Sequence, residues 1–395
     1  MPKRKHLKKR QKRWLKVIFP VVFLFCCLVG GIIVGLNDKG VTPAYVPANH
    51  KLGAPLLRKR SPLEKASQEI HEPRDAKSAQ IDQLLLSKNF SGTALIYHNG
   101  QIILNKSYGF KDVGNQITNT LSTQYCIGSI QKTQTAYLIA KQIAAGRLHF
   151  SDPLSKFFPQ VPNSEHITIK DLLNMTTGLR MQPPPVQEMS ATDPNAILKM
   201  IITRTTFFGN KKYSYQAVNY NLLVGILEQV TKTDYYQLFE KQITNTMQLE
   251  QTSFAAEKDP DQALPYSFKN GVSTLMPAPD AAYALELGTG NIFMSASDLF
   301  AFYQKFFSNY YLAKPLRTEM LQPYPGEKYA SGNYNLTNYF HSRGVKITYE
   351  GIINYGANGR DCVILLSNRQ DPTLTINKLS DEITQLIVPY KVQPV

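Results

Sequence analysis

The longest uninterrupted run of apolar residues lies near the start of the chain. Residues 17–36, VIFPVVFLFCCLVGGIIVGL, carry no charge, and as a helix they would span roughly 30 Å, the thickness of a bilayer core. Residues 1–16 hold nine Lys and Arg residues and no acidic residue. Because a basic flank keeps that end of a spanning helix in the cytoplasm, we expect a single-pass transmembrane anchor, with everything after Leu36 extracellular.

Two other interpretations of residues 17–36 are open. A cleaved signal peptide is disfavoured because no small-x-small cleavage site follows the run, which is also longer than a usual signal core. A lipoprotein site at Cys26 or Cys27 is disfavoured by the bulky residues before each cysteine. We therefore expect an uncleaved anchor in the cytoplasmic membrane, with the basic tail against anionic lipid headgroups.

Alternating apolar and polar residues predict strands near both ends of the remaining chain. The stretch TALIYHNGQIILNKSYGF is typical of a hairpin, because Asn99-Gly100 favours a tight turn. A second hairpin is predicted from KITYEGIINY through Asn358-Gly359 to DCVILLSN. Helices are expected before the first hairpin, at 76–89, and after the second, at 375–388.

Between the hairpins, apolar residues recur every three or four positions, as on one face of a helix. Helices are predicted at 129–145, 168–175, 194–204, 217–231, 234–245 and 296–307. Ser295, with Asp298 three residues later, forms a capping arrangement before the last of these. The pattern predicts an α/β (α+β) fold, with one antiparallel sheet built from N- and C-terminal segments, flanking helices and an inserted, mostly helical region. We expect the functional site in the seam between the two parts.

The domain organisation follows from the same pattern. Residues 37–78 contain five prolines among charged residues and predict an extracellular linker. We therefore expect a cytoplasmic basic tail (1–16), a transmembrane anchor (17–36), this linker, and one folded domain (79–395).

Composition supports a large folded domain and limits its partners. With 43% hydrophobic residues, the chain can bury a core. The net charge of +15 is concentrated near the start, because residues 1–16 carry nine positive charges and residues 37–80 carry eight positive and five negative charges. The rest of the chain is nearly neutral, so nucleic-acid binding is not expected.

Cysteine and histidine placement points to neither a disulfide framework nor a metal site. Only Cys126 and Cys362 lie outside the apolar run, and whether these two pair is left open. No His, Cys and Asp cluster has the spacing of a zinc site. We therefore expect no metal and no cofactor.

The stretch YCIGSIQKTQT, residues 125–135, places Ser129 and Lys132 on one face of a predicted helix start. A serine hydroxyl becomes a nucleophile only beside a base. A lysine, with an ordinary pKa of about 10.4, can be that base where burial and a helix amino terminus favour its neutral form. Lys132 is thus a candidate proton acceptor, and the Ser129 amide a candidate oxyanion donor. An ordinary helix cap with a solvated lysine is the alternative for the pair alone.

The sequence around this pair extends the pattern. The segment CIGSIQKTQTAYLIAKQIAAGRLHFSDPLSKFFP resembles the serine beta-lactamase and D,D-peptidase (penicillin-binding-protein-like) family of class C type, in which Ser-x-x-Lys opens a helix that leads to Gly-[Lys/Arg]-Leu-x-x-x-Asp-Pro. Further similar segments, in order, are ITIKDLLNMTTGL, NYNLLVGILEQVT, MQLEQTSF and GTGNIFMSASDL. The resemblance implies a beta-lactamase/transpeptidase-like fold and acyl transfer through a serine ester.

Two further motifs of that family are altered in this chain. The family has a Tyr-x-Asn element, in which the tyrosine transfers a proton and the asparagine binds an amide of the substrate. Alignment through Tyr220 places Tyr215 at the tyrosine position and Ala217 at the asparagine position. A register based on Tyr213 is the alternative, as is a core role for either tyrosine. The third family element, a Lys or His, one residue and a Gly, is nearest to FHSRGVKITYEG.

In that third element, the resemblance gives His341 the basic position and Arg343 the glycine position, and makes the Gly344 amide a second oxyanion donor. The Arg343 side chain should either crowd the cleft or offer donors to an anionic group. A plain surface histidine remains the alternative for His341.

These departures suggest a substrate. The missing asparagine disfavours peptides, whereas a D-alanyl ester has no amide to grip, and the phosphates of lipoteichoic acid would suit Arg343. We therefore expect a membrane-anchored extracellular serine hydrolase that removes D-alanyl esters from the (lipo)teichoic acid of a Gram-positive cell wall. The alternatives are a D,D-carboxypeptidase acting on peptidoglycan stem peptides and a non-catalytic module that binds the cell wall.

Overall fold

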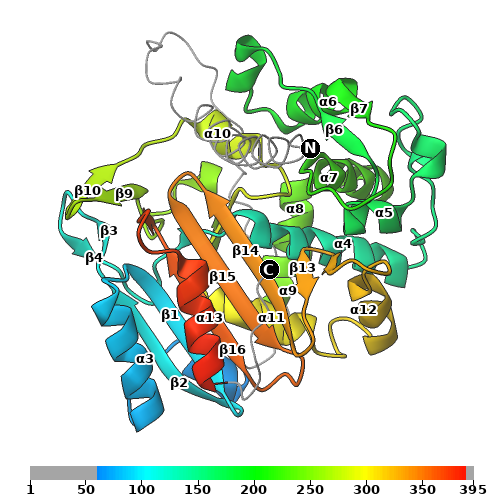
Figure 1. The fold of residues 1–395 in the computed structure, drawn as a ribbon. Coiled ribbons are helices and arrows are strands. Elements are labelled where there is room, and N and C mark those ends of the chain that lie inside the picture. The colour runs from blue at the N-terminus through cyan, green and yellow to red at the C-terminus, as the bar shows by residue number, and fades with distance from the viewer. Residues whose placement is uncertain (1–59, 388–395) are drawn as a thin grey trace, which may run out of the picture. The chain divides into compact units, whose positions relative to one another are not determined.

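A seven-stranded antiparallel sheet organises residues 60–387, the part of the chain that the computed structural model describes (Figure 1). Its strand order is β12-β13-β14-β15-β16-β1-β2. The strands are β1 (Gly92–His98), β2 (Gln101–Tyr108), β12 (Tyr329–Ala330), β13 (Asn333–Asn335), β14 (Tyr339–Lys346), β15 (Tyr349–Gly356) and β16 (Cys362–Ser367). Because β1 pairs with β16, segments from opposite ends share one sheet, which confirms the predicted fold class.

Both predicted hairpins are present. Strands β1 and β2 are joined by Asn99 and Gly100, which have φ angles of 52° and 86°. Two successive positive φ values are typical of a type I′ turn, which matches the twist of paired strands. Strands β15 and β16 form the second hairpin, in which Gly359 has a φ of 68°.

Helices cover both faces of the sheet. Side chains alternate along β1, so that Ala94 and Ile96 pack in a cluster with α3 (Ala76–Ser87) and α13 (Ile376–Ile387). On the other face, Leu95 and Tyr97 join the larger core, where the Tyr97 ring meets that of Phe300 in α11 (Ala296–Phe306) at 5.1 Å. The helices expected at both ends of the chain therefore lie side by side on one face (Figure 1).

The inserted region is mostly helical, as predicted. Its helices are α4 (Gln131–Ala144), α5 (Ile169–Asn174), α6 (Pro194–Arg204), α7 (Val218–Thr231), α8 (Tyr235–Phe239), α9 (Asn245–Met247), α10 (Asp280–Ala284) and α12 (Lys314–Leu321). The helix expected at 234–245 is divided by a π-helical turn at Glu240–Thr244. The Ser295 side chain caps α11 by accepting from the Asp298 amide at 3.1 Å.

Short strands complete the fold. A three-stranded sheet joins β5 (Tyr125–Cys126), β11 (Ile292–Met294) and β8 (Thr252–Phe254), and it fixes the segment just before α4. The others are β3 (Phe110–Asp112), β4 (Ile117–Thr118), β6 (Leu179–Met181), β7 (Thr205–Phe207), β9 (Tyr266–Lys269), β10 (Val272–Leu275) and β17 (Arg369–Gln370). Cys126 and Cys362 are both buried and free, so they do not pair.

The folded body begins earlier than the expected boundary at residue 79. Helix α2 (Pro62–Ala66) is capped by Ser61, and Glu64 pairs with Lys305 of α11 at 2.8 Å. The carbonyl of Ser67 accepts from the buried Asn105 side chain at 3.0 Å. Proline and charge made this segment resemble a linker, but specific polar contacts and the packing of Leu63 and Ala66 against the core hold it in place, which composition does not reveal.

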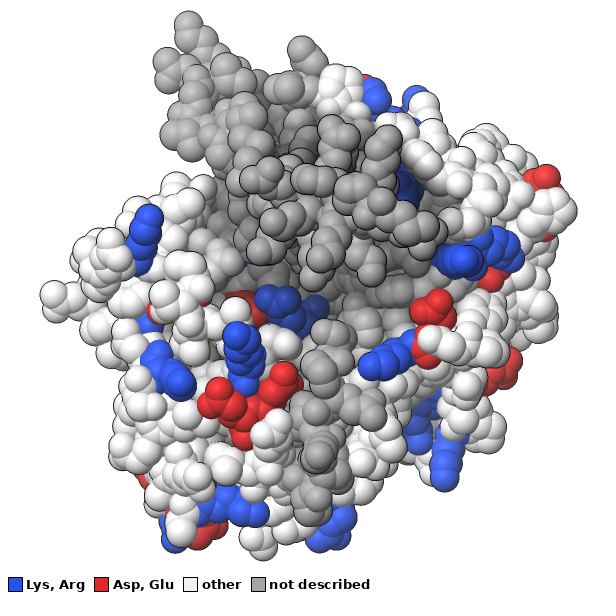
Figure 2. Space-filling model, viewed as in Figure 1, with Lys and Arg blue, Asp and Glu red and all other residues white. Residues whose placement is uncertain are grey.

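The tail, the anchor and most of the linker that we predicted lie outside the described residues. Within residues 60–387, no helix combines the length and apolar character needed to cross a bilayer. The same residues hold no group of three or more His, Cys, Asp or Glu side chains that could bind a metal ion. On the face drawn in Figure 2, basic and acidic side chains are interspersed over the described surface.

Candidate active site

The Ser129 hydroxyl lies beside the Lys132 amine. Ser129 is in a short 3-10 turn, Gly128–Ile130, that leads directly into α4. The Lys132 Nζ lies 2.9 Å from Ser129 Oγ and donates to the Thr289 carbonyl at 3.1 Å. Lys132 is 2% exposed, whereas Ser129 is partly exposed. The structure therefore brings an accessible hydroxyl and a buried amine into hydrogen-bond contact.

Tyr215 borders the same amine. It lies in the loop before α7, is 41% exposed, and its ring centroid is 5.2 Å from Lys132 Nζ. Tyr213, the alternative in the sequence, is instead hydrogen-bonded to the Tyr334 hydroxyl at 3.0 Å, and burial raises the pKa of Tyr213 far above its ordinary value. The geometry therefore favours the register that contains Tyr215.

The position two residues after Tyr215 offers no amide side chain. Ala217 is exposed at the amino-terminal end of α7. The nearby Asn219 is buried, and its amide is already used, because it accepts from Thr177 Oγ1 at 2.6 Å and donates to the Gln216 carbonyl at 2.9 Å. Asn219 therefore does not replace the missing asparagine.

Strand β14 contacts the serine turn at Gly344. A Cβ at this position would lie 1.8 Å from the Ile127 carbonyl oxygen and 2.7 Å from the Ser129 nitrogen. Only a residue without a side chain permits such an approach. Gly344 therefore takes the glycine position of the third motif, which corrects the register that assigned this position to Arg343.

The one-residue shift changes the neighbouring assignments. Ser342 moves into the basic position, where it is buried and donates to the Gly332 carbonyl at 2.8 Å. Val345 becomes the residue after the glycine, and its nitrogen lies 2.8 Å from where a Cβ on Gly128 would be. The Val345 amide therefore joins that of Gly344 as a candidate for the second oxyanion donor.

His341 is not brought to the site. It is three residues from Gly344, and side chains an odd number of positions apart along a strand point to opposite faces. Its Nδ1 lies 2.7 Å from Asn354 Oδ1, and the Asn354 amide in turn donates to Thr384 of α13. Burial lowers the pKa of His341. The histidine is thus part of the packing between the sheet and α13, which corrects its expected substrate role.

Arg343 leaves β14 on the face opposite to Gly344, because the two residues are adjacent on the strand. Its Nε donates to Glu350 Oε1 at 2.8 Å, and its side chain is 43% exposed. Burial raises the pKa of Tyr334, and the charge of Arg343 lowers it by a smaller amount. Arg343 therefore neither crowds Ser129 nor stands as an isolated charge.

A pair of charges that we did not anticipate lies behind Lys132. Lys346 Nζ contacts Glu286 Oε1 at 2.9 Å, and Thr289 Oγ1 donates to Glu286 Oε2 at 2.7 Å. Burial raises the pKa of Glu286, but the charges of Lys346 and Lys132, together with the hydrogen bonds from Thr289 and Lys346, lower the value to about 2. The only sequence signal was an acidic residue within the glycine-containing stretch LELGTGN.

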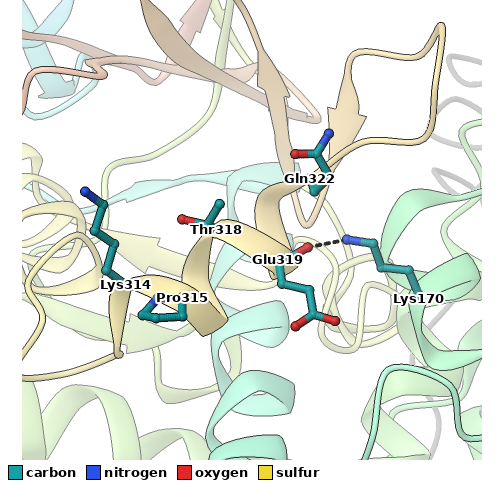
Figure 3. Close-up of a pocket in the computed structure, with 6 residues that line it drawn as sticks. All are labelled: Lys170, Lys314, Pro315, Thr318, Glu319 and Gln322. Carbon is teal, nitrogen blue, oxygen red and sulfur yellow. Dashed lines mark hydrogen bonds between the residues drawn. The ribbon is translucent and has the colours of Figure 1, made fainter.

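A separate cavity of about 480 Å³ lies between α5 and α12 (Figure 3). It is lined by Lys170, Lys314, Pro315, Thr318, Glu319 and Gln322. Lys170 reaches across it and donates to the Glu319 carbonyl, near the end of α12, and burial lowers its pKa to about 8. A cation that binds the last carbonyls of a helix stabilises that end, so we interpret Lys170 as a helix cap.

Comparisons with known proteins found similar sequences and similar structures. A sequence model of the beta-lactamase family matches residues 78–372. A protein named penicillin-binding protein PbpX from Bacillus subtilis strain 168 is 26% identical over 392 residues, which are 98% of each chain. A teichoic acid D-alanine hydrolase from Staphylococcus aureus strain MRSA252 is 30% identical over 235 residues, which are 58% of each chain.

Among solved structures, that of FmtA from Staphylococcus aureus is similar with a TM-score of 0.71. The two share 23% sequence identity, and the similarity covers 84% of this chain and 97% of the other. This likeness supports the fold.

Proposed function

The chain belongs to the beta-lactamase family, and on this premise we propose that it hydrolyses D-alanyl esters of teichoic acid through an acyl-serine intermediate. The family match and the relative named as a hydrolase support serine hydrolase activity. The teichoic acid ester as the substrate is the part that we propose. The substrate is argued from the Ser129 and Lys132 pair together with Ala217, which stands two residues after Tyr215, where a peptide substrate would need an amide partner.

The chemistry begins with removal of the Ser129 proton. A neutral amine keeps one lone pair, so Lys132 can accept this proton while it still donates to the Thr289 carbonyl. Ser129 Oγ then attacks the ester carbonyl, and the amides of Ser129 and of Gly344 or Val345 stabilise the oxyanion. Tyr215, whose ring centroid lies 5.2 Å from Lys132 Nζ, is the group that we assign to relay the proton to the departing alkoxide of the polymer.

Hydrolysis of the acyl-serine completes the cycle. A water molecule transfers a proton to Lys132 or Tyr215 and attacks the D-alanyl carbonyl. The same groups return a proton to Ser129 Oγ as the bond between this oxygen and the acyl group breaks. The products are free D-alanine and the polymer hydroxyl. No cofactor is needed, because each step transfers only protons and the acyl group.

The substrate proposal rests on the missing amide side chain at Ala217 and on the exposed guanidinium of Arg343. A peptide carbonyl and amine left without a partner would cost about 1–3 kcal/mol, which a D-alanyl ester with a free ammonium avoids. Arg343 leaves β14 on the face opposite to Gly344, but its guanidinium is half-exposed, so the polymer's phosphates could reach it outside the acyl site. The named activity of the staphylococcal relative supports the same substrate class.

The place of action is also part of the proposal. The uncharged run at 17–36, after a strongly basic tail, favours a single-pass anchor in the cytoplasmic membrane. Such an anchor would hold the catalytic domain outside the cell, where lipoteichoic acid is displayed. Protease treatment of intact cells should then cleave the domain but not an epitope placed on residues 1–16.

A direct test measures D-alanine release from purified lipoteichoic acid by the full chain, with Ser129→Ala as the inactive control. We expect release by the wild type, and mass spectrometry of a trapped intermediate should place the acyl group on Ser129. A stem pentapeptide is tested in parallel. Release from the pentapeptide but not from teichoic acid would replace the esterase with a carboxypeptidase.

The non-catalytic alternative has its own signature. A folded wild-type chain that binds teichoic acid, but whose Ser129 is not labelled by a fluorophosphonate, would be a binding module. Labelling of the wild type, absent in Ser129→Ala, would exclude that interpretation.

A further inference from the structure

We propose that Glu286 and Lys346 are positioning residues for the Lys132 amine, acting as a compensating charge pair that sets the pH at which this amine can accept the Ser129 proton. The inference rests on the proposed function, in that Lys132 must serve as the base. It adds two residues from the loop before β11 and from the far end of β14, neither of which belongs to the three sequence motifs.

The pair is linked to the amine through one short loop. Glu286 accepts from the Thr289 hydroxyl, while the Thr289 carbonyl accepts from Lys132 Nζ. The backbone closes the same loop, because the Glu286 carbonyl accepts from the amides of Thr289 and Gly290. The Glu286 carboxylate therefore fixes the residue whose carbonyl orients the amine.

Lys346 joins this loop to the strand that touches the serine. It is two residues beyond Gly344 on β14, and residues two apart point to the same face of a strand. Its Nζ reaches Glu286 Oε1 at 2.9 Å. The side chains of Lys346 and Glu286 are 17% and 31% exposed, so solvent screens their fields only in part.

The two charges act on Lys132 in opposite directions. The Glu286 carboxylate stabilises an ammonium at Lys132, and the Lys346 ammonium destabilises it. The interaction is reciprocal, since the charge of Lys132 is one cause of the low pKa of Glu286. In the proposed arrangement, the Lys346 ammonium offsets the effect of the Glu286 carboxylate on the Lys132 amine.

Other titratable groups face this assembly. Tyr215 packs over Lys132 from the loop before α7, and the buried Cys126 faces both Glu286 and Lys346 from β5. Burial raises the pKa of Cys126 to about 12, which keeps it neutral across the pH range of the test. Arg343 lies on the opposite face of β14 and is paired with Glu350.

The test is the pH dependence of the rate at which a fluorophosphonate labels Ser129 in the full chain. This readout needs no natural substrate, so it is independent of whether the ester is teichoic. With Glu286→Gln, the acid limb of the rate profile should move to lower pH by roughly one unit, the usual effect of a neighbouring charge. With Lys346→Gln, it should move to higher pH by a similar amount.

The double variant Glu286→Gln/Lys346→Gln separates charge from packing. If the charges compensate, its profile returns close to that of the wild type, although each single variant shifts. Lys156→Gln, which removes one charge from the exposed pair of Lys156 with Asp152, is the matched control and should leave the profile unchanged. Circular dichroism melting checks that each variant is folded.

The outcomes distinguish the two proposals. Opposite shifts that cancel in the double variant support the inference. Folded single variants with the wild-type profile, or shifts in the same direction, overturn it while leaving the esterase intact. A wild type whose Ser129 is not labelled at any pH overturns the proposed function and this inference with it.

Discussion

Gly344 is the residue at which one added methyl group should do the most damage. Because a Cβ there would overlap the Ile127 carbonyl, Gly344→Ala must push β14 away from the serine turn. Overpacking of this kind typically costs about 1–3 kcal/mol, and the displaced strand should also slow Ser129 labelling. Urea denaturation measures the first effect and fluorophosphonate kinetics the second.

The matched control is Gly114→Ala. Gly114 does not have a positive φ, and a Cβ there would meet only Asp112 Oδ1, at 3.5 Å. That variant should keep the wild-type stability and labelling rate. Equal behaviour of the two alanine variants would mean that β14 does not press on the turn in solution.

Arg343 should determine affinity for the polymer rather than the chemical step. In Arg343→Gln, the KM for lipoteichoic acid should rise roughly tenfold, because a charge-assisted contact to phosphate is lost. The kcat on a small D-alanyl ester without phosphate should not change. Steady-state kinetics on both substrates, with the exposed Arg74→Gln as control, check this; a loss of kcat on both would assign Arg343 to the chemistry instead.

The sequence could predict the centre of the site because the spacing is local. Ser129 and Lys132 are three residues apart at a helix start, so helix geometry alone brings them together. The role of His341 could not be judged in this way, because a one-residue change of register on β14 reverses which side chains face the serine. Only the contact of Gly344 with the turn fixes that register.

At the scale of elements, α11 carries a buried acid whose ionisation opposes folding. Burial raises the pKa of Asp298 from 3.8 to about 6, although it accepts from the Gln251 amide and the Thr252 hydroxyl. Since the folded state holds this proton more tightly than the unfolded state, the contribution of Asp298 to stability is present below pH 4 and is lost as pH rises to about 6.

Asp298→Asn should remove this dependence. Two pKa units correspond to about 3 kcal/mol as an upper bound, so the variant should gain stability relative to the wild type by up to this amount between pH 4 and pH 7. Guanidinium denaturation at several pH values measures it. Asp193→Asn, at the exposed cap of α6, is the control and should show no comparable trend. A constant difference across this range would contradict the prediction.

Long elements with regular periodicity were predictable, and short ones were not. The hairpins at Asn99-Gly100 and Asn358-Gly359 have their own turn signals, and α4 and α7 span several turns of repeating apolar positions. Strands β5, β8 and β11 have only two or three residues each, which is too few to establish an alternation. Their pairing comes from tertiary contacts.

At the scale of the whole folded unit, residues 61–75 belong to the domain and should stabilise it. The Glu64 carboxylate pairs with Lys305, and the Ser67 carbonyl accepts from Asn105 and Ser297, both of which are buried. Removal of the segment would leave these groups without partners, at about 1–3 kcal/mol each.

A chain that begins at residue 76 should therefore unfold several degrees lower than one that begins at residue 60. Thermal melting of the two chains, at equal pH and concentration, measures the difference. Asn105→Ala in the longer chain should reproduce part of the loss. Equal melting temperatures would mean that this segment packs without contributing to stability.

The location of the site, in the seam between the sheet and the helical region, was predictable because the strands come from both ends of the chain and the helices from between them. The residues of the candidate active site come from four separate stretches: the turn before α4, the loop before α7, the loop before β11, and β14. All four stretches contain a segment that resembles the family, but the register on β14 was wrong and neither Glu286 nor Lys346 belongs to a motif. Glu286 and Lys346 meet across the fold, so the sequence could not link them.

The close backbone contact between β14 and the serine turn separates positions that tolerate change from those that do not. Gly128 and Gly344 have no room for a side chain, whereas Ala217, Arg343 and Val345 are exposed. A combinatorial library intended to redirect the enzyme toward other acyl donors should diversify these three positions and keep both glycines. Selectivity could then evolve without disturbing the nucleophile.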